Sequence, residues 1–390
     1  MAKNNKLHQA QNDKNDEFYT QLSDIEKELK NYRHHFKDKV VLCNCDDPYE
    51  SSFFKYFAMN FNYLGLKKLI STCYDGSPIA GTQLNLFNYN EFLETSSKTA
   101  YVAEITHVED LNNDGAIDLD DIELLLKKCG SIHKLKGNGD FRSDECIEFL
   151  KEADIVVTNP PFSIFREYVN QLMEYNKKFI ILANMNCLTY KDFFSLMQKN
   201  LIWCGYGFNM SMVFKTPYPN KLEANRKFVI SKGYDPDKGY VKVPSICWFT
   251  NLDISKRYEP LILYKKYNSE EFPKYENYDA INVDATTDIP CDYFGNIGVP
   301  ITFLDKYNPK QFEIVALGIV GSIEFSNNRK MEILDENGKE TGKFTFNAKG
   351  TLYRKYNPDK DKKGPAFKDV ETGELYSSIY ARIIIRKKVQ

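Results

Sequence analysis

The chain has 390 residues, of which 42% are hydrophobic, 14% aromatic and 27% charged. These values predict a folded globular protein and exclude a largely disordered one. Lys plus Arg number 52 and Asp plus Glu number 54, so the net charge of −2 excludes a uniformly basic, histone-like protein.

Hydropathy and cysteine spacing predict the cellular compartment of the protein. No apolar stretch reaches the roughly 18 residues that a membrane-spanning helix requires, and the polar first residues lack the apolar core of a secretory signal. Nine cysteines without a C-x-x-C pair favour reduced thiols over disulfides or a zinc site. We therefore expect a cytoplasmic protein with no membrane partner.

Apolar spacing predicts an α/β fold for the first half of the chain. A polar tail (1–15) is expected to be disordered, and an amphipathic helix is expected over 16–36. Short apolar runs predict strands at 39–48, 66–75, 101–108, 153–159 and 177–185, and helical spacing predicts a helix at 163–175. Alternating strands and helices indicate a largely parallel sheet within residues 16–200.

The second half of the chain differs from the first in its pattern of apolar residues and in its net charge. Over residues 201–390, short apolar runs separated by Tyr, Asn, Pro and Gly predict a β-richer region with long loops. Residues 1–200 carry a net charge of −7, whereas residues 201–390 carry +5. This asymmetry suggests that the halves meet different partners, although ordinary variation among solvated lysines explains it equally well.

The tetrapeptide Asn159-Pro160-Pro161-Phe162 carries the clearest chemical signal. It follows the predicted strand at 153–159 and precedes the predicted helix. Ligand-binding groups of open α/β sheets lie at the carboxyl ends of strands, and the two prolines fix the backbone there. A rigid loop without chemistry is the alternative.

This pattern is typical of methyltransferases that act on an exocyclic or amide nitrogen. The lone pair of such a nitrogen is delocalised into the neighbouring π-system, so the nitrogen is a poor nucleophile. The side-chain oxygen of Asn159 and the carbonyl of Pro160 are suitable acceptors for its two N–H groups, which would return electron density to nitrogen. Phe162 would stack on a planar substrate.

Several stretches resemble the EcoRI-type family of adenine-specific DNA methyltransferases. They include VVLCNCDDPYESSFFKYFAMNFNYLGLKKLISTCYD (40–75), GDFRSDECIEFLKEADIVVTNPPFSIFREYV (139–169) and PITFLDKYNPKQFEIVALG (300–318). The resemblance implies a Rossmann-like sheet that binds S-adenosyl-L-methionine (AdoMet), with residues 16–200 as catalytic core. It also implies N6-methylation of a flipped-out adenine in duplex DNA, with Asn159, Pro160 and Phe162 as catalytic residues.

The same resemblance places the methyl donor beside the ends of the first strands. Asp140 and Phe141, just before a predicted helix, fall where such enzymes hold the donor's adenine, and Asn159 is also expected to contact the donor. The usual glycine-rich loop after the first strand is absent, and Asp46, Asp47 and Pro48 occupy its place. We expect Asp46 or Asp47 to contact the donor and Asp75 to contact its ribose. Capping of the following helix is the alternative for the aspartate pair.

A second motif has the spacing of a calcium-binding loop. Asp110, Asn112, Asp114, the carbonyl of Ala116 and Asp121 occupy ligand positions, and Gly115 occupies the sharp turn. The residues after the loop (123–128) predict an exiting helix. We hypothesise a structural Ca²⁺ here; the alternative is a metal-free turn that caps the helix.

Basic side chains in the second half predict the DNA-binding surface. Phosphate binding requires only a local basic face. Some of the basic side chains are expected to form that face, and the others are expected to be solvated lysines. The candidates are Lys221, Arg226 and Lys227; Arg354, Lys355, Lys360, Lys362 and Lys363; and Arg382, Arg386, Lys387 and Lys388. Residues 201–390 are thus expected to hold the remaining core strands and the region that recognises the target.

Two other functions remain open at this point. One is an N-P-P-F methyltransferase that acts on RNA or on a protein glutamine amide, and the other is a catalytically silent relative that binds DNA or calcium. We expect a monomer, with a cognate restriction endonuclease as a candidate functional partner.

Overall fold

The computed structural model describes residues 18–45, 47–75, 100–128, 131–216, 225–326 and 329–389. The expected disordered tail, Asp46 and Lys221 lie outside these residues. The chain forms two compact units: residues 1–185 with 204–252, and residues 186–203 with 253–390. Neither unit is continuous in sequence, so the division differs from a single boundary at residue 200. Within the described residues, no helix has the length and apolarity to cross a membrane.

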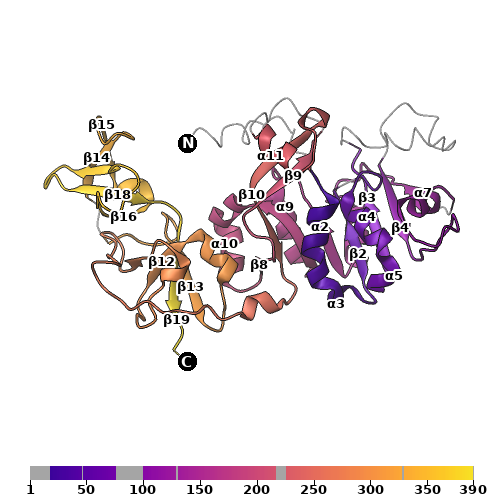
Figure 1. Ribbon diagram of the computed structural model, residues 1–390, viewed down its shortest axis with the longest axis horizontal. Helices are drawn as coiled ribbons and strands as arrows, with labels where there is room; N and C mark the ends of the chain where they lie inside the picture. The colour runs from indigo at the N-terminus through magenta and orange to yellow at the C-terminus, as the bar shows by residue number, and fades with distance from the viewer. Residues whose placement is uncertain are drawn as a thin grey trace. The chain divides into compact units, whose positions relative to one another are not determined.

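The first unit is built on one sheet, whose strands run from indigo to red in Figure 1. Its order is β1-β9-β10-β7-β6-β2-β3-β4-β5, and β8 (Trp203–Cys204) pairs with β10. The strands are β1 (Tyr19–Thr20), β2 (Val40–Cys43), β3 (Lys68–Thr72), β4 (Tyr101–Ile105), β5 (Ile132–Lys134), β6 (Ile155–Thr158), β7 (Lys178–Asn184), β9 (Met210–Lys215) and β10 (Tyr240–Thr250).

Four central strands of this sheet are parallel, as the sequence predicts. Strand β2 pairs in parallel with β3 and β6, and β6 pairs in parallel with β7. These strands are almost wholly buried and consist mainly of Val, Ile and Leu, which is typical of parallel strands covered on both faces. The flanks differ, because β4 and β5 on one side and β10, β9 and β1 on the other are antiparallel.

Helices cover the parallel strands. Helix α4 lies against β3, α8 against β2, α9 against β7 and α11 against β10. The helices of this unit are α2 (Leu22–Leu29), α3 (Arg33–Phe36), α4 (Ser52–Met59), α5 (Phe61–Leu64), α7 (Leu119–Lys128), α8 (Asp144–Glu152), α9 (Phe165–Glu174) and α11 (Arg226–Ser231).

The single helix expected over 16–36 is wrong. The chain instead forms strand β1, helix α2, a 3-10 turn (Lys30–Tyr32) and helix α3. Residues Tyr19 and Thr20 pair with β9, and the extended Gln21 separates them from α2. Helical spacing continues through this segment, but pairing with a strand almost 200 residues away overrides the local preference.

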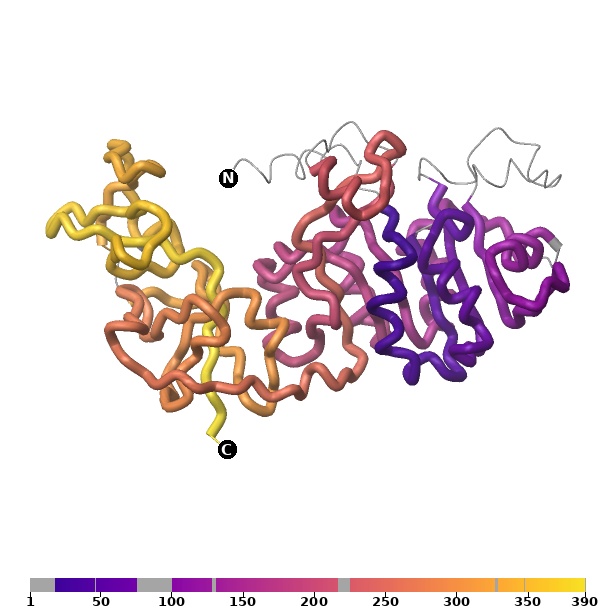
Figure 2. The backbone as a smooth tube through the Cα atoms, in the orientation of Figure 1, coloured from indigo at the N-terminus to yellow at the C-terminus, as the bar shows by residue number. Residues whose placement is uncertain are grey.

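The second unit contains two smaller sheets, as the β-rich texture predicts. One has the order β11-β12-β19-β13 and the other β15-β14-β17-β18-β16. Figure 2 shows the yellow C-terminal strand β19 passing among the orange strands with which it pairs. The elements are α10 (Lys191–Gln198), β11 (Ile281–Asn282), β12 (Ile297–Pro300), β13 (Phe312–Leu317), β14 (Lys330–Leu334), β15 (Glu340–Phe346), β16 (Leu352–Lys355), β17 (Phe367–Asp369), β18 (Leu375–Ile379) and β19 (Arg382–Lys387).

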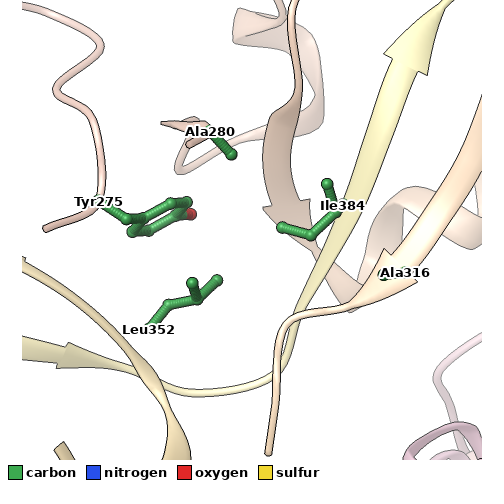
Figure 3. Close-up of a cluster of buried hydrophobic side chains, with 5 residues drawn as sticks. All are labelled: Tyr275, Ala280, Ala316, Leu352 and Ile384. Carbon is green, nitrogen blue, oxygen red and sulfur yellow. The ribbon is translucent and has the colours of Figure 1, made fainter. Parts of the chain in front are cut away.

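A small apolar cluster joins the two sheets of this unit. Leu352 of β16 packs with Ile384 of β19 and Ala316 of β13, and Tyr275 and Ala280 complete the cluster (Figure 3). Burial of such side chains contributes roughly 1.5–3 kcal/mol for each large one.

Candidate functional site

The predicted tetrapeptide lies at the carboxyl edge of the parallel strands. Strand β6 ends at Thr158, Asn159 follows directly, and α9 begins at Phe165. The carbonyl of Pro161 accepts the N–H of Ile164, which leads into the helix. The expected strand, turn and helix are therefore confirmed.

Asn159 holds a buried acceptor with no partner among the described residues. The residue is 7% exposed, and its Nδ2 donates to the carbonyl oxygen of Phe18 at 2.6 Å. Because only the NH₂ group donates, this bond assigns the other atom as oxygen. Oδ1 is buried without a hydrogen bond. An acceptor that stays unpaired in a buried position costs about 1–3 kcal/mol.

Phe162 is placed by another aromatic ring. Its ring stacks on Phe18 with a centroid separation of 5.8 Å and an interplanar angle of 26°. Phe162 is half-buried, whereas Pro160 is buried. Asn159 and Phe162 lie in the same short segment, and Phe18 contacts both of them.

The end of β2 is tied to this segment through Asn44. Its carbonyl accepts the hydroxyl of Thr158, and its side-chain oxygen accepts the hydroxyl of Tyr168 on α9. Burial raises the pKa of Tyr168 well above its ordinary value, so the hydroxyl stays protonated and remains a donor. These bonds fix the ends of β2 and β6 relative to each other.

Asp47 lies at the end of β2, but its carboxylate faces inward. One oxygen accepts the Tyr101 hydroxyl at 2.7 Å and the Tyr49 N–H at 2.9 Å, and the other lies 3.5 Å from Cys73 Sγ. The residue is 3% exposed. The cap of α4 is Ser51, whose hydroxyl accepts the N–H of Phe54. Donor contact by Asp47 or Pro48 stays a prediction.

The two other predicted acidic residues, Asp75 and Asp140, lie on neighbouring segments beyond the end of β3. The N–H of Asp75 donates to the carbonyl of Asn138 at 3.0 Å. Gly139, at φ +77°, allows this approach, because a Cβ there would lie 2.1 Å from the carbonyl oxygen of Cys73. The segment that carries Asp140 therefore runs beside Asp75.

Asp140 is held as a carboxylate by its neighbour. Arg142 donates to it through Nε at 2.8 Å and through Nη2 at 2.6 Å. These hydrogen bonds lower the pKa of Asp140 despite partial burial. Phe141 is buried and packs edge-on against Tyr168 at 5.2 Å.

The calcium-like loop closes on itself, and α7 leaves it as predicted. Carboxylate oxygens of Asp110, Asp114 and Asp121 all lie within 4.8 Å of one another. Backbone N–H groups already reach all three: Gly115 donates to Asp110 at 2.8 Å, Leu111 donates to Asp121 at 2.8 Å, and Ala116 donates to Asp114 at 2.9 Å. Asn112 donates to Asp114, and Ala116 is exposed on the loop.

The predicted DNA-binding residues belong to both units. Some of them pair with other groups of the protein, and others are exposed. Arg226 of the first unit pairs twice with Asp237, and the neighbouring Lys227 is exposed. In the second unit, Lys355 pairs with Glu374, whereas Lys362 and Lys363 are exposed. The C-terminal group bonds within its own unit, with Arg382 on Asp284, Arg386 on Asn296, Lys387 on the carbonyl of Cys291 and Lys388 on that of Pro309.

Arg354 is buried rather than presented at the surface. It is 5% exposed and makes a two-bonded pair with Asp361, and Lys360 donates to the carbonyl of Glu270. Burial is the largest single effect and would by itself raise the pKa of Asp361, but the hydrogen bonds from Arg354, from the Asn357 N–H and from Ser377, with the charge of Arg354, together outweigh it and lower the pKa.

The pair predicts a pH-dependent contribution to stability. Because the pKa of Asp361 is lower in the folded state, the stabilisation is complete above about pH 4 and disappears as pH falls through the folded pKa. We expect Asp361→Asn to unfold at lower urea than wild type at pH 7. The difference should shrink towards pH 3, and an equal difference at both pH values would contradict this assignment.

A basic cavity lies at the opposite edge of the sheet. It has a volume of about 600 Å³ and lies beside α3 and Gly65, the segments that lead into β2 and β3. It is therefore at the amino ends of the parallel strands. Its lining includes Lys30, Arg33, His34 and Lys37.

Two residues that make long-range contacts in the first unit, Phe18 and Glu28, belong to no motif in the sequence. Phe18 contacts the tetrapeptide across 141 positions of chain. Glu28, which is 2% exposed, accepts the backbone N–H groups of Tyr206 and Gly207. Only the amphipathic spacing around Phe18 indicated that its side chain is buried.

Comparison with known proteins shows the family to which the chain belongs. A family model described as adenine-specific methyltransferase EcoRI matches residues 6–388. Type II methyltransferase M.EcoRI of Escherichia coli is 47% identical over 322 residues, which cover 80% of this chain and 89% of that protein. M.MgeORF184P of Mycoplasma genitalium and M.MpnI of Mycoplasma pneumoniae, both named Type II methyltransferases, are each 37% identical over 314 residues. These cover 79% of this chain and 85% and 84% of those proteins. No solved structure matches. The chain belongs to the EcoRI family of adenine-specific methyltransferases.

Proposed function

We propose that this protein transfers a methyl group from AdoMet to N6 of an adenine flipped out of duplex DNA. The unpartnered, buried Oδ1 of Asn159 carries the proposal. An acceptor held in place before the substrate binds stabilises a developing charge without reorganisation. Adenine offers the matching group, because its exocyclic N6 has two N–H donors.

The chain's own residues explain how N6 becomes reactive. Asn159 Oδ1 accepts one N–H of N6, and the Pro160 carbonyl accepts the other, so the lone pair localises on nitrogen. Phe162 stacks on the flipped base and offsets part of the unstacking free energy, a few kcal/mol. Bound AdoMet would supply an electrophilic methyl group on a sulfonium; its C–S bond would break as the N–C bond forms, the neutral thioether would leave, and N6 would lose one of its protons to water. No covalent enzyme intermediate is required.

The residues at the ends of β2 and β3 fit the donor. Asp75 follows β3, and its N–H bonds to the carbonyl of Asn138, while the close passage of Gly139 on Cys73 sets the Asp140–Phe141 segment beside it. This arrangement supports a contact of the Asp75 carboxylate with the ribose hydroxyls of the donor. The sheet order, with four parallel strands and an antiparallel β10 next to β7, supports a Rossmann-like assignment. We assign Asp75, Asp140 and Phe141 to the donor site and Asp47 to its wall, since Asp47 already bonds internally.

Labelled methyl transfer tests the function directly. Parallel reactions offer duplex DNA, structured RNA and a glutamine-containing protein to the same enzyme. Label in N6-methyladenine of duplex DNA supports the proposal. Label only in RNA or in a glutamine amide favours the alternative substrate, and no AdoMet binding by calorimetry favours a silent relative.

The cellular role is tested with genomic DNA. The relatives are named Type II methyltransferases, which supports a role beside an endonuclease with the same target. Long-read sequencing of DNA from cells that express the chain identifies the modified base and its context. Resistance of that DNA to an endonuclease of the same specificity would establish the pairing, and continued cleavage would exclude it.

Lys362 and Lys363 are proposed to bind DNA phosphates. Both are exposed in the second unit, whereas Lys355 nearby is paired with Glu374 at 2.7 Å. Each phosphate contact adds about 0.9 to the slope of log affinity against log salt. We expect the double variant Lys362→Ala/Lys363→Ala to reduce that slope by about 1–2, measured by fluorescence anisotropy. Lys355→Ala is the control, and an unchanged slope in the double variant would remove these residues from the interface.

We also propose that the loop at Asp110 binds a structural Ca²⁺. Three carboxylates converge there, and Gly115 at φ +91° makes the required turn. We expect Ca²⁺ to raise the melting temperature by a few degrees, as mass action predicts for a ligand of the folded state, and a chelator to reverse the shift. Asp110→Asn should abolish the response. A melting temperature insensitive to Ca²⁺ would leave only the helix-capping turn.

A further inference from the structure

Phe18 lies outside every motif of the sequence and contacts two residues of the tetrapeptide. We infer that Phe18 is a positioning residue of methyl transfer: its carbonyl orients the Asn159 amide, and its ring sets the plane of Phe162. This inference rests on the proposed function, since the role of Phe18 is exerted through those two residues. It also gives the segment before α2 a part in the reaction.

The backbone of Phe18 is held by the edge of the sheet. Immediately after it, Tyr19 pairs with Lys215 and Thr20 pairs with Phe214 on β9. Gln21 adds a side-chain bond to the carbonyl of Tyr19 at 3.0 Å. The Phe18 carbonyl therefore occupies a fixed position, although β1 has only two residues.

That carbonyl selects one of two orientations of the Asn159 amide. Rotation of the amide by a half-turn exchanges oxygen and NH₂, and only one orientation presents Oδ1 to a substrate amine. The Phe18 carbonyl has no proton, so it accepts Nδ2 at 2.6 Å and repels the reversed amide. Without it, the two orientations would interconvert before each turnover.

The ring of Phe18 supports Phe162 from behind. It is 5% exposed, stacks on Phe162 at 5.8 Å and meets Phe214 of β9 edge-on at 6.2 Å and 76°. Phe162 is thus anchored through Phe18 to the sheet. A stacking ring that is already oriented loses less freedom when it receives the base.

Phe18→Leu tests the ring with little change of volume, and Phe36→Leu is its matched control. Phe36 is fully buried in the same N-terminal region, but its ring contact is with Phe57. For each variant, kcat and the KM for AdoMet are measured on whichever substrate accepts label from wild type. Melting temperature and Kd for duplex DNA are measured alongside.

We expect Phe18→Leu to lower kcat at least tenfold while the KM for AdoMet stays within about threefold, the pattern of an interaction lost in the transition state. Phe36→Leu should lower the melting temperature at least as much and keep kcat. Phe18→Tyr, which retains the ring, should recover most of the activity. Equal kcat in Phe18→Leu and Phe36→Leu would overturn the inference.

A readout without catalysis separates this inference from the proposed function. The side-chain amide signals of Asn159, assigned by their loss in Asn159→Ala, report its contact with residue 18. Phe18→Leu should shift these signals because it removes the neighbouring ring, and Phe36→Leu should not. Since Phe18→Leu keeps the carbonyl of residue 18, the bond itself is tested by hydrogen exchange of the Asn159 NH₂ in wild type, which should be slow. If DNA receives no label, the proposed function fails, while these signals still decide the contact; exchange as fast as that of exposed asparagine amides would refute the bond, and unshifted signals in Phe18→Leu would refute the ring's part.

Discussion

Asn159→Ala should lower kcat for methyl transfer to DNA by about 10²–10³-fold, the usual effect of losing one preorganised polar group. The variant removes the buried Oδ1 that accepts nothing within the described residues. It also relieves the protein of an unsatisfied acceptor, although the Phe18 carbonyl loses its donor. Stability should therefore change little, because these two effects oppose each other.

Substrate binding separates this result from misfolding. The Kd for duplex DNA should stay within a few-fold of wild type, since phosphate contacts supply most of the affinity. Asn60→Ala is a suitable control, because Asn60 also bonds a backbone carbonyl, that of Tyr56, but within α4. Near-normal turnover of Asn159→Ala would contradict the assigned mechanism.

Glu28→Ala should have the largest effect on stability, a loss of about 3–5 kcal/mol in the free energy of unfolding. The carboxylate is 2% exposed and accepts the Tyr32 hydroxyl at 2.8 Å, the Tyr206 N–H at 2.8 Å and the Gly207 N–H at 2.6 Å. Truncation leaves the buried Tyr32 hydroxyl and two partly buried backbone N–H groups without this acceptor. Burial, followed by the charge of Glu28, raises the pKa of Tyr32 well above its ordinary value.

The measurement can be restricted to the first unit. The protein has two tryptophans, and Trp248 is buried in the first unit. Urea unfolding followed by Trp248 fluorescence in a Trp203→Phe background therefore reports that unit. Glu26→Ala, an exposed change on the same helix, should alter stability by less than about 0.5 kcal/mol. A similarly small loss for Glu28→Ala would show that water replaces the lost acceptor.

The parts of the fold that could be predicted depend on local patterns. Strand β6 and the tetrapeptide after it are neighbours in sequence, so an apolar run followed by Asn-Pro-Pro-Phe places the site at a strand end. The helix leaving the calcium-like loop is predictable for the same reason. In these segments local preference and tertiary structure agree.

Contacts between distant segments could not be predicted in this way. In the sequence, Glu28 has the pattern of an ordinary polar residue on an amphipathic helix. Its burial depends on Gly205, where a Cβ would lie 2.4 Å from Glu28 Oε1. Arg354 reads as a surface cation, yet Asp361 pairs with it in the interior of its unit. Single-sequence periodicity describes one element at a time and contains no information on such partners.

The interleaved course of the chain limits how it can be shortened. Residues 186–203 belong to the second unit although they lie between β7 and β10 of the first. Their helix α10 packs on β13, and Gln198 donates to the carbonyl of Val315 at 2.6 Å. Truncation after residue 252 would retain α10 and remove β13, exposing the face of α10 that packs on β13. Such a fragment would be prone to aggregate, so the first unit alone would require replacing 186–203 with a polar linker.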